Sequence, residues 1–318
     1  MNSRQIMIYT LLALLPGTLA CTWFFGFGVL ANLMICFAAA VTTDFIVNKL
    51  RDQDWQLDYA SLLTAALLAL CLPPLLPFWM AGLATVFALV FGKHIYGGTG
   101  HNVFNPAMVG YAMLIVSFPL AMSFWPAEAT NQPGLVLEIK STLTQGLPEH
   151  DAVSSATPLD EYKFREAMTN AEYFGEQAEA NFSQWMTINV GFLLGGILLI
   201  YMKIVSWRVP ATFLATIGVL SIVFYDSGSS ASLGSPLFHW LSGGTMLAAF
   251  FIITDPVSRP TYPLGILVFA AGVGLITFII RTIGGYPDGI AFAVLLMNAA
   301  SPLIDHFLQR REVTVETA

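Results

Sequence analysis

Residues 6–47 read IMIYTLLALLPGTLACTWFFGFGVLANLMICFAAAVTTDFIV and hold a single charged side chain, Asp44. A helix that crosses a lipid bilayer needs about 20 mostly apolar residues. This stretch is therefore long enough for two consecutive spans, at 6–26 and 27–47. A small-x-small cleavage pattern does not separate them, so we expect the first segment to be retained rather than removed as a signal peptide.

The chain as a whole is also strongly apolar. Its 318 residues are 56% hydrophobic and 10% charged, with a mean hydropathy of +0.69. Soluble domains carry roughly a quarter charged residues, so a soluble globular enzyme is excluded. Disorder and nucleic-acid binding are also excluded, because the chain has neither a charge excess nor a basic patch. We predict an all-α polytopic membrane protein with about ten transmembrane helices, at 6–26, 27–47, 59–77, 79–95, 104–124, 185–205, 209–225, 237–254, 263–281 and 287–308.

One long polar segment, residues 125–184, divides these spans into five and five. It holds ten of the twenty acidic residues and three cations, so its net charge of −7 equals that of the whole chain. The predicted domains are a first membrane half (1–124), an acidic loop (125–184) and a second membrane half with a short tail (185–318). An odd number of spans per half would make any internal repeat inverted.

Lysine and arginine predict the orientation, because they concentrate in cytoplasmic segments. With the N-terminus in the cytoplasm, nine of the thirteen cations fall inside. Three of the other four lie in the long loop. Both termini are therefore predicted to be cytoplasmic, and the loop that contains Thr157 to be external.

The three cysteines, Cys21, Cys36 and Cys71, lie inside apolar runs without a CxxC pair. We interpret them as small buried hydrophobic residues, and the sequence predicts no metal site.

The acidic loop contains a run of small residues before a proline. It reads Asp151-Ala-Val-Ser154-Ser155-Ala156-Thr157-Pro158. Pro158 disfavours helical geometry at Thr157 and favours an extended backbone, which would present the hydroxyl on an open, strand-like segment to a modifying enzyme. The alternative is an ordinary turn in which Thr157 caps a helix-like stretch over 159–179.

A second motif, Gly97-Gly-Thr-Gly-His-Asn102-Val-Phe-Asn105-Pro106-Ala107, stands between two predicted spans. Broken backbone at membrane depth must be buried in protein or line a cavity. If the turn is helical, Asn102 and Asn105 share a face, and their amides suit the donor and acceptor edge of a flavin ring. The alternative is a tight loop whose asparagines cap the next helix.

Three acids at the ends of predicted spans are candidates for ion coupling: Asp44, Asp255 and Asp305. An ionisable residue in or beside a span is a functional candidate, although each of these could instead cap a helix in the headgroup region. The stretch from Arg281 to Asp288, with Gly284-Gly285 between them, also carries charge at a span end.

Taken together, these stretches resemble the family that contains the D subunit of the Rnf (Rsx) ion-translocating electron transport complex and the B subunit of the sodium-pumping NADH:quinone reductase. The matching stretches are Leu14-Leu-Pro-Gly17, Trp23-Phe-Phe-Gly26, Tyr96-Gly-Gly98, Phe104-Asn-Pro-Ala-Met-Val-Gly-Tyr111, Ala156-Thr-Pro-Leu-Asp160, Ala249-Phe-Phe251, Thr254-Asp-Pro-Val257 and Gly284-Gly-Tyr-Pro-Asp-Gly-Ile-Ala-Phe-Ala-Val-Leu-Leu296. Residues 151–157 also resemble the signal read by periplasmic flavin transferases, except that Ser155 stands where glycine is common.

The resemblance implies a flavin-carrying subunit of a bacterial inner-membrane complex that couples ferredoxin:NAD⁺ electron transfer to Na⁺ or H⁺ movement. FMN would be joined to Thr157 by a phosphoester. A non-covalent flavin, riboflavin, near Asn102 and Asn105 is a further implication that the residues leave open. The implied partners are the A, B, C, E and G subunits of the Rnf complex, the flavin transferase and membrane lipid. A complete active site is not expected on this chain alone, since nothing in it resembles a GxGxxG turn after a strand.

Two other classes of protein fit ten spans. One is a channel or carrier for a small solute, without a redox role. The other is a membrane scaffold that docks partners through the acidic loop. Covalent flavin on the denatured protein would support the redox subunit and neither alternative.

Overall fold

The computed structural model describes residues 2–126, 154–165, 168–175, 178–286 and 288–316, and within them strand pairing is confined to β1 and β2. In chain order the elements are α1 (Ser3–Ala13), α2 (Leu15–Phe25), α3 (Gly28–Leu50), α4 (Tyr59–Cys71), α5 (Phe78–Gly92), η1 (His94–Tyr96), α6 (Pro106–Ser117), α7 (Pro119–Met122), β1 (Trp125–Pro126), β2 (Ser154–Ser155), α9 (Pro158–Lys163), α10 (Asn170–Tyr173), α11 (Ala178–Tyr201), α12 (Arg208–Val223), η4 (Asp226–Gly228), α13 (Pro236–Leu241), α14 (Thr245–Leu247), the π-helix η5 (Ala248–Ile252), α15 (Pro263–Thr282) and α16 (Ile290–Glu316).

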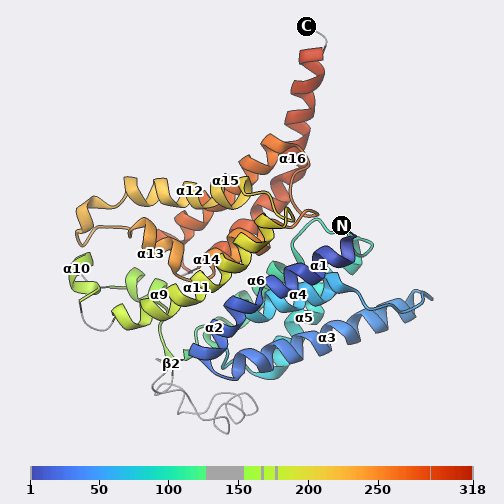
Figure 1. Ribbon diagram of the computed structural model, residues 1–318, viewed down its shortest axis with the longest axis horizontal. Coiled ribbons are helices and arrows are strands. Elements are labelled where there is room, and N and C mark those ends of the chain that lie inside the picture. Colours follow the sequence, from blue (N-terminus) through green and yellow to red (C-terminus); the bar gives the residue numbers. More distant parts are fainter. Residues whose placement is uncertain (1, 127–153, 166–167, 176–177, 287, 317–318) are drawn as a thin grey trace.

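The helices run back and forth between two ends of the molecule (Figure 1). We call these the Thr157 end, which holds Thr157 and Asp288, and the Asp58 end, which holds Asp58, Lys93 and Asp305. Ten segments of the described chain join the two ends: α1–α2, α3, α4, α5, α6, α11, α12, α13 to η5, α15 and α16. The predicted all-α polytopic fold is confirmed, and the arrangement of these segments is consistent with about ten spans, five on each side of the loop.

Contacts at both ends agree with this order. At the Asp58 end, the Arg4 guanidinium donates to the Tyr59 hydroxyl at 2.8 Å, which joins the start of α1 to the start of α4. At the Thr157 end, the Lys163 ammonium donates to the carbonyl oxygen of Ile280 at 3.1 Å, beside the end of α15. These contacts agree with helices that alternate in direction along the chain (Figure 1).

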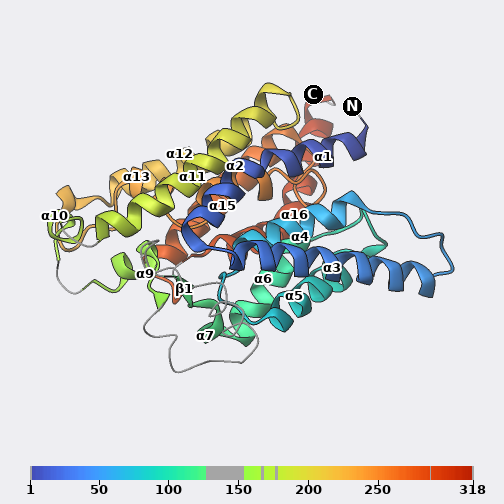
Figure 2. The same cartoon turned by 60° about the horizontal axis from the view of Figure 1, so that its bottom comes forward.

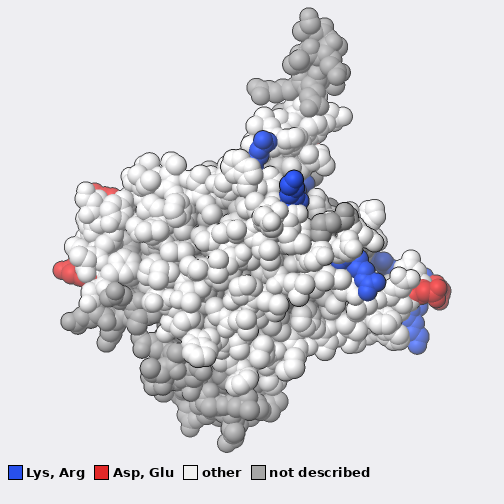
Figure 3. All heavy atoms as spheres, viewed as in Figure 1, with Lys and Arg blue, Asp and Glu red and all other residues white. Residues whose placement is uncertain are grey.

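Six described helices are long and apolar enough to cross a membrane: Ser3–Phe25, Gly28–Leu50, Phe78–Tyr96, Asn181–Tyr201, Pro263–Thr282 and Ile290–Gln309. Three more apolar helices are shorter: Tyr59–Cys71, Pro106–Ser117 and Arg208–Val223. On the face shown in Figure 3, charged side chains lie toward the two ends and near α16, and the broad surface between them is uncharged. The chain is therefore a polytopic membrane protein.

Several predicted spans are interrupted rather than continuous helices. The helix expected over 59–77 ends at Cys71, because Pro73 and Pro74 cannot continue it. The carbonyl of Pro73 accepts from the amide of Leu76 at 3.1 Å and from Asn32 Nδ2 at 3.0 Å. Likewise, the helix expected over 104–124 ends at Ser117, before Pro119. The buried side-chain amide of Asn32 therefore ties α3 to the chain just after the end of α4.

The two halves pack in corresponding ways. In the first half α3 packs on α4 and α5, and α5 packs on α6. In the second half α12 packs on α13 and α15, and α15 packs on α16. The first span of each half meets its counterpart, because α2 lies along α11 in both views (Figures 1 and 2). Since corresponding spans run in opposite directions, this pattern is the one that two inverted five-span halves would give.

Glycine allows α11 to approach the first span closely. A Cβ placed on Gly195 would lie 1.8 Å from the carbonyl oxygen of Ala13. Small residues at such contacts let helix backbones approach, which is how van der Waals packing holds helices together in lipid. The contact between the two halves therefore depends on the absence of a side chain here.

The eighth span, expected over 237–254, is broken at Ser242–Gly244 between α13 and α14. Gly243 has a φ of +57°, which favours glycine. The Asn189 amide on α11 fills the break: its nitrogen donates to the carbonyls of Leu241 and Gly243, both at 3.0 Å, and its oxygen accepts from the amide of Met246 at 3.0 Å. This one side chain supplies partners for three backbone groups of the interrupted helix.

We expect Asn189→Leu to destabilise the protein markedly. The substitution leaves two buried carbonyls and one N–H without these partners, and each such group costs about 1–3 kcal/mol. The check is the thermal unfolding midpoint of the purified protein in detergent. Thr187→Ala is the matched control, because the Thr187 hydroxyl bonds only to its own helix, at the carbonyl of Ser183. Equal midpoints for the two variants would contradict the role of Asn189.

The topology gives a second prediction. Five spans separate Glu172 from the end of α16, so reporters fused near these points should lie on opposite sides of the membrane. Alkaline phosphatase and green fluorescent protein fusions in cells would measure this, with activity of the phosphatase expected only near Glu172. Two fusions on the same side would contradict the ten-span order.

Candidate functional site: a cavity at the Thr157 end

Thr157 is the N-cap residue of α9. Its backbone is extended, with φ −70° and ψ 158°, as the following proline predicted. The hydroxyl accepts from the amide of Asp160 at 3.3 Å and donates to the Asp160 carboxylate at 2.7 Å. Thr157 is only 8% exposed, so it does not stand on an open segment as expected. Both the predicted extended geometry and the predicted helix cap are present, but the hydroxyl faces inward.

The residues just before Thr157 are held in place by β1 and by α11. Ser155 pairs with Trp125 in the antiparallel β1–β2 ladder, and Ser154 is the other residue of β2. Ala156 is exposed, and its carbonyl accepts from Asn181 Nδ2 at 3.0 Å. Asp151, the first residue of the predicted motif, lies outside the described residues.

Past Thr157, the loop packs on the second half through a small aromatic core. Its buried members are Leu159, Tyr162, Tyr173 and Phe238. The Tyr162 hydroxyl also donates to Asn170 Oδ1 at 2.7 Å. The helix-like stretch expected over 159–179 is therefore two short helices, α9 and α10, folded onto α13.

Lys163 ties this loop segment to α15. Its ammonium donates to the carbonyls of Ile280 (3.1 Å), Gly284 and Tyr286 (2.9 Å). A cation at the C-terminus of a helix also interacts favourably with the helix dipole. Together with the aromatic core, this contact sets the position of α9 relative to the spans.

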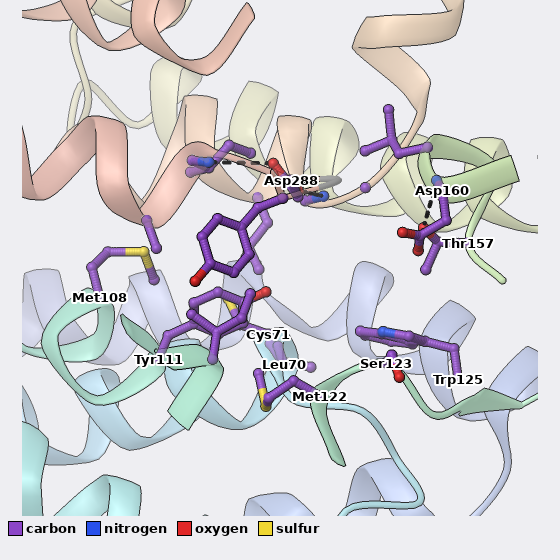
Figure 4. Close-up of a pocket in the computed structure, with 18 of the residues that line it drawn as sticks. Leu70, Cys71, Met108, Tyr111, Met122, Ser123, Trp125, Thr157, Asp160 and Asp288 are labelled. Atoms are coloured by element: carbon purple, nitrogen blue, oxygen red, sulfur yellow. Dashed lines mark hydrogen bonds between the residues drawn. The ribbon is translucent and has the colours of Figure 1, made fainter. Parts of the chain in front are cut away.

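Thr157 and Asp160 lie on the wall of a cavity of about 290 Å³ between the two halves (Figure 4). Most of its lining is apolar or aromatic, and Cys71 contributes a thiol. The lining residues are Leu70, Cys71, Met108, Tyr111, Ile115, Pro119, Met122, Ser123, Trp125, Thr157, Leu159, Asp160, Trp185, Gly243, Gly244, Leu247, Ile252, Gly285, Tyr286, Asp288, Ile290 and Ala291. An apolar cavity with a few polar groups is typical of a small-molecule site.

Asp288 contributes a carboxylate to the cavity wall, and it pairs with the buried Arg281, which lies outside the cavity lining. The Arg281 side chain is 1% exposed, and its guanidinium lies 3.1 Å from Asp288 Oδ1. The same guanidinium donates to the carbonyl of His239 at 3.0 Å, and Asp288 Oδ2 accepts from the amide of Gly244 at 3.2 Å. A buried charge needs such a partner and further hydrogen bonds. The two side chains thus also provide hydrogen-bond partners for backbone groups at the break in the eighth span.

Sequence reasoning noted Arg281 and Asp288 but did not select them as site residues. Their signal was a pair of opposite charges on either side of a Gly-Gly turn at a span end. Nothing in that pattern indicates that the turn brings the two side chains together beneath the break in another span.

Asn105 lies behind the inner wall of the cavity. The turn before it is not helical, so Asn102 and Asn105 do not share a helix face. Asn105 caps α6 by accepting from the amide of Met108 at 3.2 Å, and its Nδ2 donates to the carbonyl of Ile252 at 3.4 Å. Asn102 Nδ2 donates to the carbonyl of Phe104 at 3.0 Å. Both amides are buried and bonded within the protein, and a second flavin beside them stays a prediction.

The three acids predicted for ion coupling all lie toward the Asp58 end. Asp44 is buried, 2.8 Å from His94 Nε2 and 3.6 Å from Lys93 Nζ. Asp255 accepts from the amide of Val257 at 3.1 Å and from the Ser258 hydroxyl at 2.9 Å.

Asp305 accepts from both the amide and the hydroxyl of Thr261, at 3.0 and 2.9 Å. Asp255 and Asp305 therefore hold the same connection, between η5 and α15. The structure brings these two near one loop but away from Thr157.

Asp58 joins the Asp44 cluster and was not predicted. Its carboxylate lies 2.6 Å from Lys93 Nζ and accepts from Thr99 Oγ1 at 2.6 Å. Burial alone would raise the pKa of Asp58, but the Lys93 ammonium and these hydrogen bonds hold it below its usual range. Asp58 also caps α4, and aspartate at that position is common, so the sequence signal was that of an ordinary helix start.

Comparison with known proteins gives the family. Residues 1–314 match the model of the NQR2, RnfD, RnfE family. Three similar proteins are each named as the D subunit of an ion-translocating oxidoreductase complex. The protein of Ectopseudomonas mendocina is 44% identical, over 98% of this chain and 91% of its own. That of Pseudomonas aeruginosa is 45% identical, over 98% and 91%. That of Yersinia pseudotuberculosis is 42% identical, over 98% and 94%. The sequence resemblance is confirmed, and this chain belongs to the NQR2, RnfD, RnfE family.

Proposed function

We propose that this chain is the flavin-carrying membrane subunit of an Rnf-type ion-translocating oxidoreductase complex. In this role it passes electrons through FMN joined to Thr157, while the complex couples ferredoxin:NAD⁺ electron transfer to Na⁺ or H⁺ movement. The observation that carries the proposal is the Thr157 hydroxyl on the wall of an aromatic-lined cavity between the halves. The names of relatives that cover 98% of the chain support the complex and its ion translocation.

The cavity suits a flavin in its chemistry. Trp125, Trp185, Tyr111 and Tyr286 present aromatic surface for a planar ring system. A volume of about 290 Å³ lies just below the range of about 300–1,000 Å³ for small-molecule sites. Bound there, a flavin would supply one- and two-electron redox chemistry. Thr157 would anchor it, and the apolar walls would limit water.

The proposal also specifies the location of the chain in the cell and its protein partners. The chain would lie in a bacterial inner membrane, with both termini cytoplasmic and Thr157 periplasmic, because the described cations of the connecting segments gather toward the Asp58 end. Its partners would be the A, B, C, E and G subunits of the complex, and a periplasmic flavin transferase during maturation.

We expect Thr157→Ala to abolish covalent flavin while the protein still inserts. The alanine has no oxygen to carry the phosphoester, and the lost helix cap costs only about 1 kcal/mol. The measurement is ultraviolet fluorescence of the denatured band in a gel, confirmed by the mass of the peptide that contains residue 157.

Thr169→Ala is the matched control. Thr169 is also the N-cap of a short loop helix and also bonds to an acid three residues later, Glu172. This variant should keep its flavin. FMN on another residue, or an unlabelled wild-type protein, would contradict the proposal and leave a solute carrier or scaffold as the better interpretation.

The proposed coupling role of Asp255 and Asp305 gives another prediction. Asparagine can still cap a turn but removes the charge, so Asp255→Asn and Asp305→Asn separate a structural cap from an ion ligand. We expect a roughly tenfold loss of ion-dependent turnover, equivalent to about 1.4 kcal/mol, with normal flavin on Thr157. The measurement is ferredoxin:NAD⁺ activity of the whole complex against Na⁺ concentration and pH.

Asp226→Asn serves as the control, because Asp226 is an exposed acid in η4 near the Thr157 end. It should leave turnover unchanged. Wild-type rates and ion dependence in both test variants would mean that these carboxylates serve only to hold the connection before α15.

A further inference from the structure

The hydroxyl of Thr157 and the carboxylate of Asp160 form a directed pair at the cavity wall. Because the oxygen of Thr157 accepts the amide hydrogen of Asp160 (3.3 Å), its own hydrogen is free to point elsewhere. That hydrogen is donated to Asp160 Oδ2 at 2.7 Å. Both residues line the cavity (Figure 4). The oxygen that would accept a phosphoryl group is thus already bonded to a potential proton acceptor.

The loop contains a second threonine–carboxylate pair with which this one can be compared. Thr169 and Glu172 make the same i to i+3 contact, with the Thr169 hydroxyl 2.9 Å from Glu172 Oε2. That pair is exposed, and hydrogen bonds from the Thr169 backbone and side chain lower the pKa of Glu172. For Asp160 the direction is opposite: burial raises its pKa and the Asp288 charge adds to the shift, although the hydrogen bonds from Thr157 and the Lys163 charge oppose it. Of the two carboxylates, Asp160 is the more basic relative to its normal value.

We propose that Asp160 is the proton acceptor for attachment of the flavin to Thr157. This inference rests on the proposed function, since it concerns how that modification is made. A flavin dinucleotide supplies the FMN group. Thr157 Oγ1 attacks the phosphorus on the FMN side, so a Thr–O–P bond forms as the pyrophosphate P–O bond breaks. AMP leaves with the bridging oxygen, and the hydroxyl proton passes to Asp160. No electrons are transferred.

Charge balance after the reaction favours the same assignment. The new phosphodiester is an anion beside residue 160, and two adjacent negative charges in a partly buried site repel each other. A carboxyl group that has taken the proton is neutral and removes that repulsion. A group whose pKa lies closer to the working pH is also the more effective general base.

The test uses the full-length chain purified from a host that lacks the flavin transferase, so that Thr157 is unmodified. Purified transferase and FAD are added, and covalent flavin is followed by gel fluorescence and intact mass between pH 5 and 9. Asp160→Asn keeps the size and the helix cap but cannot accept the proton. We expect attachment to slow at least tenfold and to lose its dependence on pH at the acidic limb. Asp160→Glu should restore part of the rate.

Glu161→Gln is the matched control, because Glu161 is the adjacent acid and lies outside the cavity lining. It should react like the wild type. A wild-type rate in Asp160→Asn, or a slower rate with the same pH profile, would overturn the role of Asp160 as proton acceptor while leaving covalent FMN intact. A wild-type chain that gains no flavin on Thr157 would instead overturn the proposed function, and this inference with it.

Discussion

The structure depends on the hydrogen bonds that the eighth span receives where its helix is broken, at Ser242–Gly244. In lipid, an unpaired N–H or C=O costs several kcal/mol, so irregular backbone persists only where protein supplies partners. Asn189 and Arg281 provide those partners for the carbonyls at the break, and Asp288 accepts from the amide of Gly244. These groups come from three different spans or their ends. The break therefore fixes α11, α13, α15 and the start of α16 in one arrangement and makes one wall of the cavity.

The loop segment is attached to that same arrangement. Tyr162 and Phe238 pack ring to ring with centroids 4.5 Å apart, and Lys163 holds the end of α15. A Cβ on Gly243 would lie 2.7 Å from Leu159 Cδ1 and 2.6 Å from Asp288 Oδ2. Gly243, in the break, therefore lies against both the Arg281–Asp288 ion pair and α9. Placement of Thr157 at the cavity follows from packing on the second half, not from the local sequence around it.

Much of this could be predicted from the sequence because lipid imposes a length and a composition on each span. Hydropathy predicted ten crossings, and Pro158 predicted the extended backbone of Thr157. The breaks at Pro73 and Ser242 were not predicted, since an apolar window does not show which residue will satisfy a freed carbonyl. The pairing of Arg281 with Asp288 was missed for the same reason. Contacts between distant spans depend on tertiary packing, which a single sequence does not display.

Helix α16 joins the two candidate regions. Asp288 stands just before its first turn, and Asp305 lies 17 positions later, about 25 Å away along an ideal helix. Between them, Asn298 accepts from the amide of Asn105 at 3.0 Å and donates to the carbonyl of Ser258 at 2.7 Å. Contact alone does not couple sites; an element with two arrangements is needed. The π-helix η5 joins the broken backbone to Asp255, and π-turns are frequent at functional sites. Through η5 and α16, the broken backbone at the cavity and the connection that holds Asp255 and Asp305 are parts of one continuous framework.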